Sequence, residues 1–268
     1  MHTLRKAVAA GLALVLAAGA SHTALAAECA ALMQPGLVAD TTVSAARDVA
    51  PADGLPAYCE VEATNSSAPG SRILTVTRLP QDWNGKFLAV GGSGFAGDTR
   101  LETMAPALKR GYATIGTNMG HTGTESLGMD WMITGKGKLN EVVLADFGER
   151  AAHVSAVVGK ALVKAYYGLA QSQSYWQGCS TGGRQGMTES QRHPDDFDGI
   201  IAGAPVFSWV LYSQSIQRAQ FFRNTPGALI TDEQVPLIRD AVLAACDRLD
   251  GVKDGYLTNP LACRWDPA

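Results

Sequence analysis

The sequence lacks an excess of either charge and, after residue 26, any long apolar run. Its 268 residues include 22 Lys and Arg against 25 Asp and Glu, and neither sign gathers into a tail or a stripe. Domains that bind nucleic acids usually carry a basic patch, and a helix that crosses a bilayer needs about 20 consecutive apolar residues. The composition therefore argues against a nucleic-acid partner and against a membrane partner.

The apolar run that does occur stands at the amino terminus. Residues 1–26 begin with the cations Arg5 and Lys6, continue through Ala and Leu residues, and end on an Ala-Leu-Ala triplet. A basic start, a short apolar stretch and an A-x-A site are typical of a secretory signal peptide. An uncleaved anchor is the alternative, but the run is too short for a membrane span. We therefore expect a soluble protein that starts near Ala27 and is secreted or periplasmic.

The sequence has few cysteines, and their number is odd. An exported protein is free to form disulfides, and an odd count leaves one thiol without an intrachain partner. The five positions are Cys29, Cys59, Cys179, Cys246 and Cys263.

Strand-like and helix-like segments alternate up to Pro205. Branched and apolar runs predict strands, and apolar residues spaced by three and four predict helices. Such alternation is typical of an α/β domain with a mainly parallel sheet that is covered on both faces. The predicted strands are 71–79, 85–90, 112–118, 174–178 and 198–206, and the predicted helices are 101–111, 140–168 and 181–193.

The pattern changes after Pro205. The stretch 206–268 contains two helical patterns with no strand between them. We therefore expect two domains after the signal peptide: an α/β core over residues 27–205, and the start of a separate helical unit over residues 206–268.

One serine stands in a tight frame of glycines. The stretch Gly178-x-Ser180-x-Gly182 fits the pattern G-x-S-x-G, and it lies between a predicted strand and a predicted helix. In that pattern the serine occupies a strained turn, the nucleophile elbow, which exposes its hydroxyl above the sheet. In isolation the motif fits an ordinary glycine-rich turn. In this context the sequence predicts Ser180 as a nucleophile.

A second glycine loop, GGSGFAG at residues 91–97, follows the strand predicted at 85–90. It satisfies the dinucleotide-binding pattern G-x-G-x-x-G, but that site also needs an acidic residue about 20 positions further on, and the sequence offers none there. In folds with a nucleophile elbow, a loop at this point supplies a backbone N–H to the oxyanion hole. We therefore expect Thr181 and Gly92 to stabilise a carbonyl oxygen during acyl transfer.

The sequence does not supply the base that a nucleophilic serine needs. In this fold the acid and the histidine follow the serine in the chain. Only His193 follows Ser180, and the intervening helix places it on the order of 20 Å away. His121 and His153 precede the serine and are expected to be surface or loop residues. No complete catalytic triad is visible.

Three segments carry a resemblance to a known family: GCSTGGRQGMTESQRHPDDFDGIIAGAPV (178–206), WNGKFLAVGGSGFAG (83–97) and CDRLDGVKDGYLTNPLACRWDP (246–267). They closely resemble the tannase and feruloyl esterase family, which consists of secreted α/β-hydrolases with a helical lid. The resemblance implies an α/β-hydrolase fold and a serine ester hydrolase that forms an acyl-enzyme on Ser180. It implies a small aromatic ester as substrate and leaves the acyl group open among galloyl, feruloyl, terephthaloyl and others.

The same resemblance gives Cys179 a role. In the family, the cysteine before the nucleophile forms a disulfide with a cysteine directly after the catalytic histidine. That second cysteine, the histidine and the acid belong to a later stretch that this sequence lacks. We therefore expect an amino-terminal portion of such an enzyme, with an incomplete α/β-hydrolase core, an unpaired Cys179 and essentially no activity on esters.

An Asp-Gly repeat lies near the carboxyl end, where Asp247, Asp250 and Asp254 fall within eight residues. Oxygen ligands and glycine turns suit Ca²⁺, but the EF-hand spacing is not met, so spacing alone fits a solvated acidic turn equally well. The resemblance implies a structural Ca²⁺ in the lid, held by those three side chains and by the backbone carbonyls of Val252 and Tyr256.

Cysteines also flank this repeat, because Cys246 precedes it and Cys263 follows it. A disulfide between them could close the loop. Together with the odd cysteine count, this predicts the pairs Cys29–Cys59 and Cys246–Cys263.

Two other functions stay open at this point. The first is a non-catalytic, exported Ca²⁺-binding module. The second is a dinucleotide-binding oxidoreductase that uses the glycine loop at residues 91–97.

Overall fold

The computed structural model describes residues 27–124, 128–135 and 137–267 of the chain. The predicted signal peptide, residues 1–26, lies outside the described residues. The chain divides into two compact units, of which the first ends at Phe207 and the second begins at Ser208. None of the helices in the described ranges has the length and apolar character that a membrane span requires.

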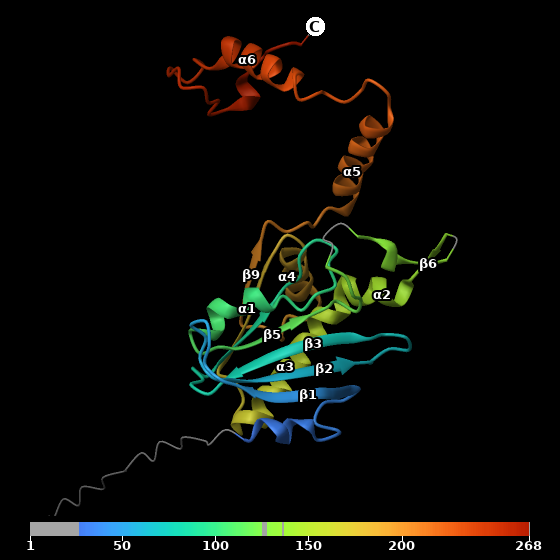
Figure 1. Cartoon of the computed structure of the whole chain (residues 1–268), viewed down its shortest axis with the longest axis vertical. Coiled ribbons are helices and arrows are strands. Elements are labelled where there is room, and N and C mark those ends of the chain that lie inside the picture. The colour runs from blue at the N-terminus through green and yellow to red at the C-terminus, as the bar shows by residue number, and fades with distance from the viewer. Residues whose placement is uncertain (1–26, 125–127, 136, 268) are drawn as a thin grey trace, which may run out of the picture. The chain divides into compact units, whose positions relative to one another are not determined.

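Seven strands of the first unit form one sheet (Figure 1), namely β1 (Thr41–Val49), β2 (Tyr58–Asn65), β3 (Ile73–Pro80), β4 (Lys86–Val90), β5 (Ala113–Thr117), β8 (Gln173–Cys179) and β9 (Gly199–Gly203). Their order in the sheet is β1-β2-β3-β5-β4-β8-β9. The strands β1, β2, β3 and β5 pair antiparallel, whereas β5, β4, β8 and β9 pair parallel. The predicted α/β class is confirmed, and the sheet is mixed, with its parallel half beside the predicted nucleophile.

The remaining elements are helices, short helical turns and a small hairpin. The hairpin pairs β6 (Ile133–Gly135) with β7 (Lys138–Leu139). The helical elements are η1 (Cys29–Met33), α1 (Leu101–Leu108), η2 (Asp130–Met132), α2 (Glu141–Ala145), η3 (Asp146–Arg150), α3 (Ala151–Tyr167), α4 (Thr181–Arg192), α5 (Trp209–Asn224), α6 (Gln234–Cys246) and η4 (Pro260–Ala262).

Helices cover both faces of the sheet. Leu88 and Val90 of β4 pack with Met104 of α1. Phe87 is one position along β4 and therefore on the opposite face, where its ring lies against Gly159 of α3. A Cβ on Gly159 would stand 2.4 Å from that ring, so glycine is what lets α3 approach the sheet closely.

The long helix predicted over residues 140–168 is present, but a π-helical turn, η3, separates α2 from α3. Asp146 in this turn is fully buried. Its carboxylate accepts hydrogen bonds from the Ser71 hydroxyl at 2.8 Å and from the Arg150 guanidinium. The helix ends at Gly168, whose φ of 69° is the left-handed conformation that glycine adopts without strain.

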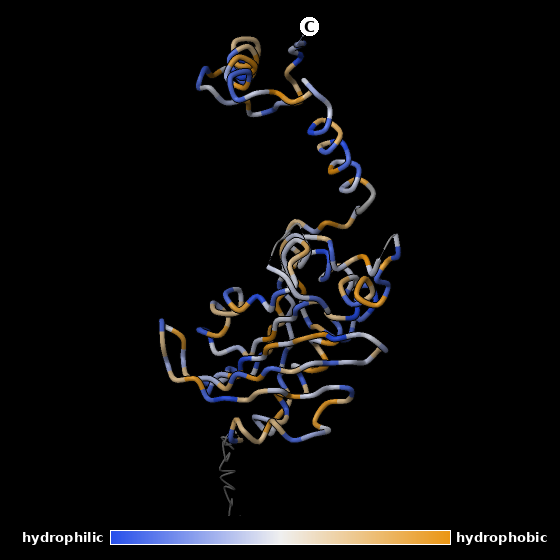
Figure 2. The backbone as a smooth tube through the Cα atoms, turned by 45° about the vertical axis from the view of Figure 1, so that its right-hand side comes forward, coloured by the Kyte–Doolittle hydropathy of each residue, from blue (hydrophilic) through white to orange (hydrophobic). Residues whose placement is uncertain are grey.

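The second unit has little apolar core of its own. Hydrophobic and hydrophilic residues are interspersed along α5 (Figure 2), and Leu211 and Phe221 of this helix are 65% and 64% exposed. Among the described side chains of this unit, only Cys246 and Asp247 are buried. Apolar burial therefore contributes little to the stability of this unit, and a disulfide between Cys246 and Cys263 closes its carboxyl-terminal loop.

The structure brings together both predicted cysteine pairs. Cys29 of η1 is bonded to Cys59 of β2, and Cys246 of α6 is bonded to Cys263, each with Cα atoms 5.5 Å apart. Cys179 is a free, exposed thiol. Each closed loop restricts the unfolded chain and should stabilise the fold by roughly 2–4 kcal/mol.

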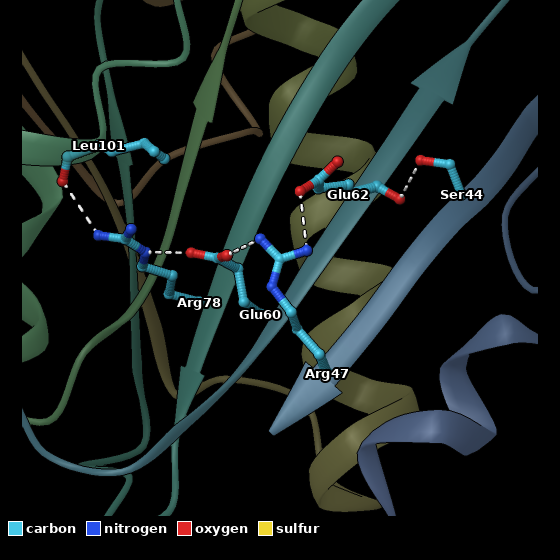
Figure 3. Close-up of polar contacts among 6 residues, drawn as sticks. All are labelled: Ser44, Arg47, Glu60, Glu62, Arg78 and Leu101. Atoms are coloured by element: carbon cyan, nitrogen blue, oxygen red, sulfur yellow. Dashed lines mark hydrogen bonds and ion pairs between the residues drawn. The ribbon is translucent and has the colours of Figure 1, made fainter. Parts of the chain in front are cut away.

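A line of ion pairs crosses the antiparallel strands (Figure 3). Glu60 on β2 stands directly opposite Arg47 on β1 and Arg78 on β3 in the strand register, and its carboxylate pairs with both guanidinium groups. The Glu60 and Arg78 side chains are only 8% and 11% exposed. Arg47 also pairs with Glu62, whose side chain is 37% exposed. Glu60 is therefore the buried centre of the line and Glu62 its solvated end.

This difference in burial predicts unequal losses of stability. We expect Glu60→Ala to lower the free energy of unfolding by on the order of 3 kcal/mol, because it leaves Arg78 buried without its carboxylate. The matched variant Glu62→Ala should cost less than about 1 kcal/mol, since its ion pair is largely solvated. Urea denaturation followed by far-UV circular dichroism measures both. Equal losses from the two variants would contradict the prediction.

Candidate active site

Ser180 forms the turn between β8 and α4. Its backbone has φ 58° and ψ −114°, a conformation that costs a non-glycine residue on the order of 1–3 kcal/mol. The Ser180 N–H donates to the Gly203 carbonyl at 3.0 Å, and the Ser180 carbonyl accepts from the Arg184 N–H at 2.9 Å. These bonds fix the strained turn between β9 and the first turn of α4, in the strand-turn-helix arrangement of a nucleophile elbow.

Glycines surround Ser180 because three backbone segments meet there. A Cβ on Gly178 would lie 2.4 Å from the carbonyl carbon of Gly182, and a Cβ on Gly91 would lie 2.4 Å from the Cα of Gly182. Real Cβ contacts are essentially never shorter than 3.0 Å. Side chains at these positions would therefore push the end of β8, the start of α4 and the loop after β4 apart.

The loop after β4 is bound to the first turn of α4. The Gly182 N–H donates to the Gly92 carbonyl at 3.0 Å, and the Thr181 hydroxyl donates to the Gly94 carbonyl at 2.7 Å. Because Thr181 is the first residue of α4, its own N–H has no acceptor within the helix. A dinucleotide site requires such a glycine loop to open a helix directly, whereas α1 begins only at Leu101. The geometry therefore favours an oxyanion loop.

The oxyanion role that the sequence predicted for Gly92 needs a correction. Its N–H is buried and donates to the Oε1 atom of Gln185 at 2.9 Å, so it is not free to donate to a substrate. Gln185 lies one turn into α4 and is itself buried, which places its amide under the loop. Ser93, the next residue, lines the cavity beside Ser180. Gly92 lines this cavity as well, so the loop faces the cavity at the predicted position, but the Gly92 N–H is already bonded to Gln185.

A cavity of about 320 Å³ lies over the elbow. Ser180, Cys179 and Gly203 line one part of it, and Gly91 to Ser93 line another. Arg100 and Thr103 are also in its wall, but the described lining residues include no histidine and no carboxylate. Within the described part of the chain, the cavity thus brings the predicted nucleophile and oxyanion loop together without a base.

The three histidines in the described residues all have other contacts. His121 lies in a loop, as expected, but is buried, and its Nε2 is 2.7 Å from the Phe95 carbonyl. His153 on α3 donates through Nδ1 to Asp196 at 2.6 Å. His193 caps the carboxyl end of α4, at the opposite end of that helix from Ser180. None of them contributes to the cavity lining.

Arg184 and Gln185 are the residues near the site that sequence reasoning missed. The Arg184 guanidinium is buried and donates to the Phe147 and Gly148 carbonyls of the π-helical turn at 2.9 and 2.7 Å. Burial lowers the pKa of Arg184 to about 10. The sequence did carry a signal for both residues. They are long polar side chains that directly follow the elbow, on a helix that must pack against a sheet.

The Asp-Gly loop is folded by its own carboxylates. The Asp247 carboxylate accepts from the Gly255 N–H at 2.9 Å, Asp250 accepts from Val252, and Asp254 accepts from Tyr256. The donor set of three carboxylates and nearby carbonyls fits the oxygen preference of Ca²⁺. In the described residues, however, these three carboxylates do not form a group with one oxygen from each within 4.8 Å of the others. A single ion would require the loop to close further.

Because the two glycine segments are in contact, the free energy of unfolding should depend sharply on side-chain size at these positions. We expect Gly91→Ala to lower the free energy of unfolding by about 3 kcal/mol or more, because the added methyl group overlaps the backbone of Gly182. Gly135→Ala is the matched control, since a Cβ there meets nothing within 4 Å. Urea unfolding of both variants tests this. A Gly91→Ala protein as stable as the control would show that the loop is not held against α4.

Comparison with known proteins agrees with this geometry. Residues 59–268 match the family described as tannase and feruloyl esterase. The chain is 41% identical over 189 residues to a probable feruloyl esterase of Arthroderma benhamiae, covering 70% of this chain and 35% of the relative. It is 36% identical over 210 residues to probable feruloyl esterase B-1 of Aspergillus oryzae, covering 78% and 37%.

Solved structures give the same result. Feruloyl esterase B from Aspergillus oryzae superposes with a TM-score of 0.74 at 32% identity, over 90% of this chain and 49% of that one. Tannin acyl hydrolase from Aspergillus niger superposes with a TM-score of 0.61 at 27% identity, over 84% and 44%. The chain spans less than half the length of these relatives. With the match over residues 59–268, the chain belongs to the tannase and feruloyl esterase family.

Proposed function

We propose that the chain carries the nucleophile and the oxyanion loop of a serine carboxylic-ester hydrolase that acts on esters of aromatic acids. The observation that supports this most strongly is the strained backbone of Ser180. A glycine at this turn would relieve the strain, so a serine held there by hydrogen bonds on both sides is consistent with a reactive hydroxyl. Membership of the family supports ester hydrolysis, and the names of the relatives support an aromatic acyl group.

The proposed reaction proceeds through an acyl-enzyme. The Ser180 Oγ attacks the ester carbonyl, the alcohol leaves, and water then hydrolyses the acyl group from the serine. As negative charge develops on the carbonyl oxygen, the Thr181 N–H donates to it from the positive end of the α4 dipole. We assign the second donor to the Ser93 N–H, since Gly92 is bonded to Gln185. Both donors are positioned before substrate binds, because hydrogen bonds join the loop to α4.

The base and its acid are proposed to come from sequence that the longer relatives have and this chain does not. The support is that, in the part of the chain that the structure describes, no histidine or carboxylate lines the cavity over Ser180. Cys179, exposed beside Ser180, is proposed to form the disulfide that ties the histidine segment to the elbow. Export is part of the proposal, because two disulfides are expected in an oxidising compartment.

This proposal predicts the behaviour of two proteins. A polypeptide that extends this chain to the length of its feruloyl esterase relatives should hydrolyse methyl ferulate or methyl gallate, and Ser180→Ala should lower kcat by at least about 10³-fold. The matched control is Ser190→Ala, an exposed serine on the same helix, which should leave kcat unchanged. Full activity of the Ser180→Ala enzyme would rule out the nucleophile.

The 268-residue chain itself should show no comparable turnover. An elbow serine without a base is a poor nucleophile. Turnover by this chain near one per second, which is typical of a working enzyme, would mean that the base lies within it and would contradict the proposed origin of the triad.

We also propose that the Asp-Gly loop holds a structural Ca²⁺ through Asp247, Asp250 and Asp254. The loop supplies oxygen donors and is closed by a disulfide. Calorimetric titration of the chain with CaCl₂ should show binding in the range of about 10⁻⁶–10⁻³ M. Asp254→Asn should weaken it, whereas Asp232→Asn, an exposed carboxylate outside the loop, should not. The absence of binding heat together with an unchanged melting temperature would contradict the proposal.

A further inference from the structure

A second group of chemically active side chains lies at the carboxyl end of α4. It contains His153 from α3, His193 at the end of α4, and Asp196 from the turn before β9. One nitrogen or oxygen from each residue lies within 4.8 Å of the others. The 12 residues of α4 separate this group from Ser180, which corresponds to about 18 Å along the helix. The group is therefore distinct from the proposed catalytic site.

The two imidazole rings and the carboxylate are arranged side by side. The rings of His153 and His193 are stacked with centroids 4.0 Å apart and planes within 16° of parallel. The His153 Nδ1 donates to Asp196 Oδ2 at 2.6 Å. Two ligands on a tetrahedral Zn²⁺ are about 3.3 Å apart, given a Zn–N distance of about 2.0–2.1 Å. The three ligand atoms thus need only small side-chain rotations to share one ion.

Glu189 provides the second observation. It lies one turn before His193 on α4, is fully buried, and neither carboxylate oxygen has a hydrogen-bond partner of normal geometry among the described residues. Glu189 lies beside Asp196, so it adds a buried carboxyl group next to the three ligand atoms.

The other charges around the group are nearly balanced. Glu149 adds negative charge near Glu189 and His193, but it is paired with Arg192 at 3.0 Å. Lys160 is the remaining cation that acts on Glu189, and its effect is smaller than those of the carboxylates. Among the described residues, the partner of the Asp196 carboxylate is the His153 imidazole, which is charged only when it is protonated.

We propose that His153, His193 and Asp196 bind a divalent transition-metal ion, with Zn²⁺ as its representative. Two imidazoles and one carboxylate are the donor set of Zn²⁺ and its neighbours in the periodic table, whereas Ca²⁺ and Mg²⁺ prefer oxygen alone. The ion takes the place of the proton between His153 and Asp196, and binding releases protons. It joins α3, α4 and the turn before β9, so its effect is on stability.

The test uses the 268-residue chain without a polyhistidine tag, in a Cys179→Ser background, because a free thiol also binds zinc. Excess CaCl₂ occupies oxygen-only sites. ZnCl₂ is then titrated against a chromophoric chelator. We expect one equivalent of Zn²⁺ to bind with micromolar or tighter affinity and to raise the melting temperature. Co²⁺ should give the visible absorption of a four-coordinate site.

Matched variants locate the ion. His153→Gln, His193→Gln and Asp196→Asn should each weaken Zn²⁺ binding by at least about 10-fold, the loss produced even by outer partners of metal ligands. Asp195→Asn, an exposed carboxylate next to Asp196, should bind as the parent does. Metal-free melting temperatures show whether each variant is folded. No stoichiometric binding by the parent chain, or unchanged binding by the His153→Gln/His193→Gln double variant, would overturn the proposal.

Discussion

The approach of the loop after β4 to the first turn of α4, with only glycine between them, is the constraint on which the site depends. Gly91 and Gly182 are so close that neither tolerates a Cβ without backbone movement. This contact lets the Gly182 N–H reach the Gly92 carbonyl, and it sets the distance between the loop and Ser180. Under the proposed function, donors that are in place before the reaction stabilise the negative charge that develops on the carbonyl oxygen in the transition state. The glycine contact supplies that preorganisation.

Buried polar side chains hold α4 in the position that this contact requires. Trp176 of β8 donates to the Gly182 carbonyl at 2.9 Å, and Gln185 accepts from Gly92. Arg184 donates to the Phe147 and Gly148 carbonyls of the π-helical turn. Because an unpaired buried polar group is costly, the bonds that satisfy these groups also fix the helix. Arg184 thus links the π-helical turn before α3 to the helix that follows the elbow.

The sequence was sufficient to predict the local features of the site. The spacing around Ser180 gave the elbow, and branched runs gave the parallel strands, because both depend on neighbouring residues. The hydrogen bond from the Gly92 N–H to the Gln185 side chain could not be predicted, because it joins positions far apart in the chain. The same holds for His193: helix length showed that it does not reach Ser180, but nothing in the spacing showed that His153 on another helix stacks against it.

The two ends of α4 differ in the charge that they favour, and this bears on the proposed ester-hydrolysis site and on the proposed zinc site. The helix dipole places partial positive charge at the amino end and partial negative charge at the carboxyl end. Thr181, at the amino end, has an N–H suited to a developing oxyanion. His193, at the carboxyl end, follows the last carbonyls of the helix, where a cation is stabilised. A metal ion at that end would also bind α4 to α3, and so hold the helix whose other end presents Ser180.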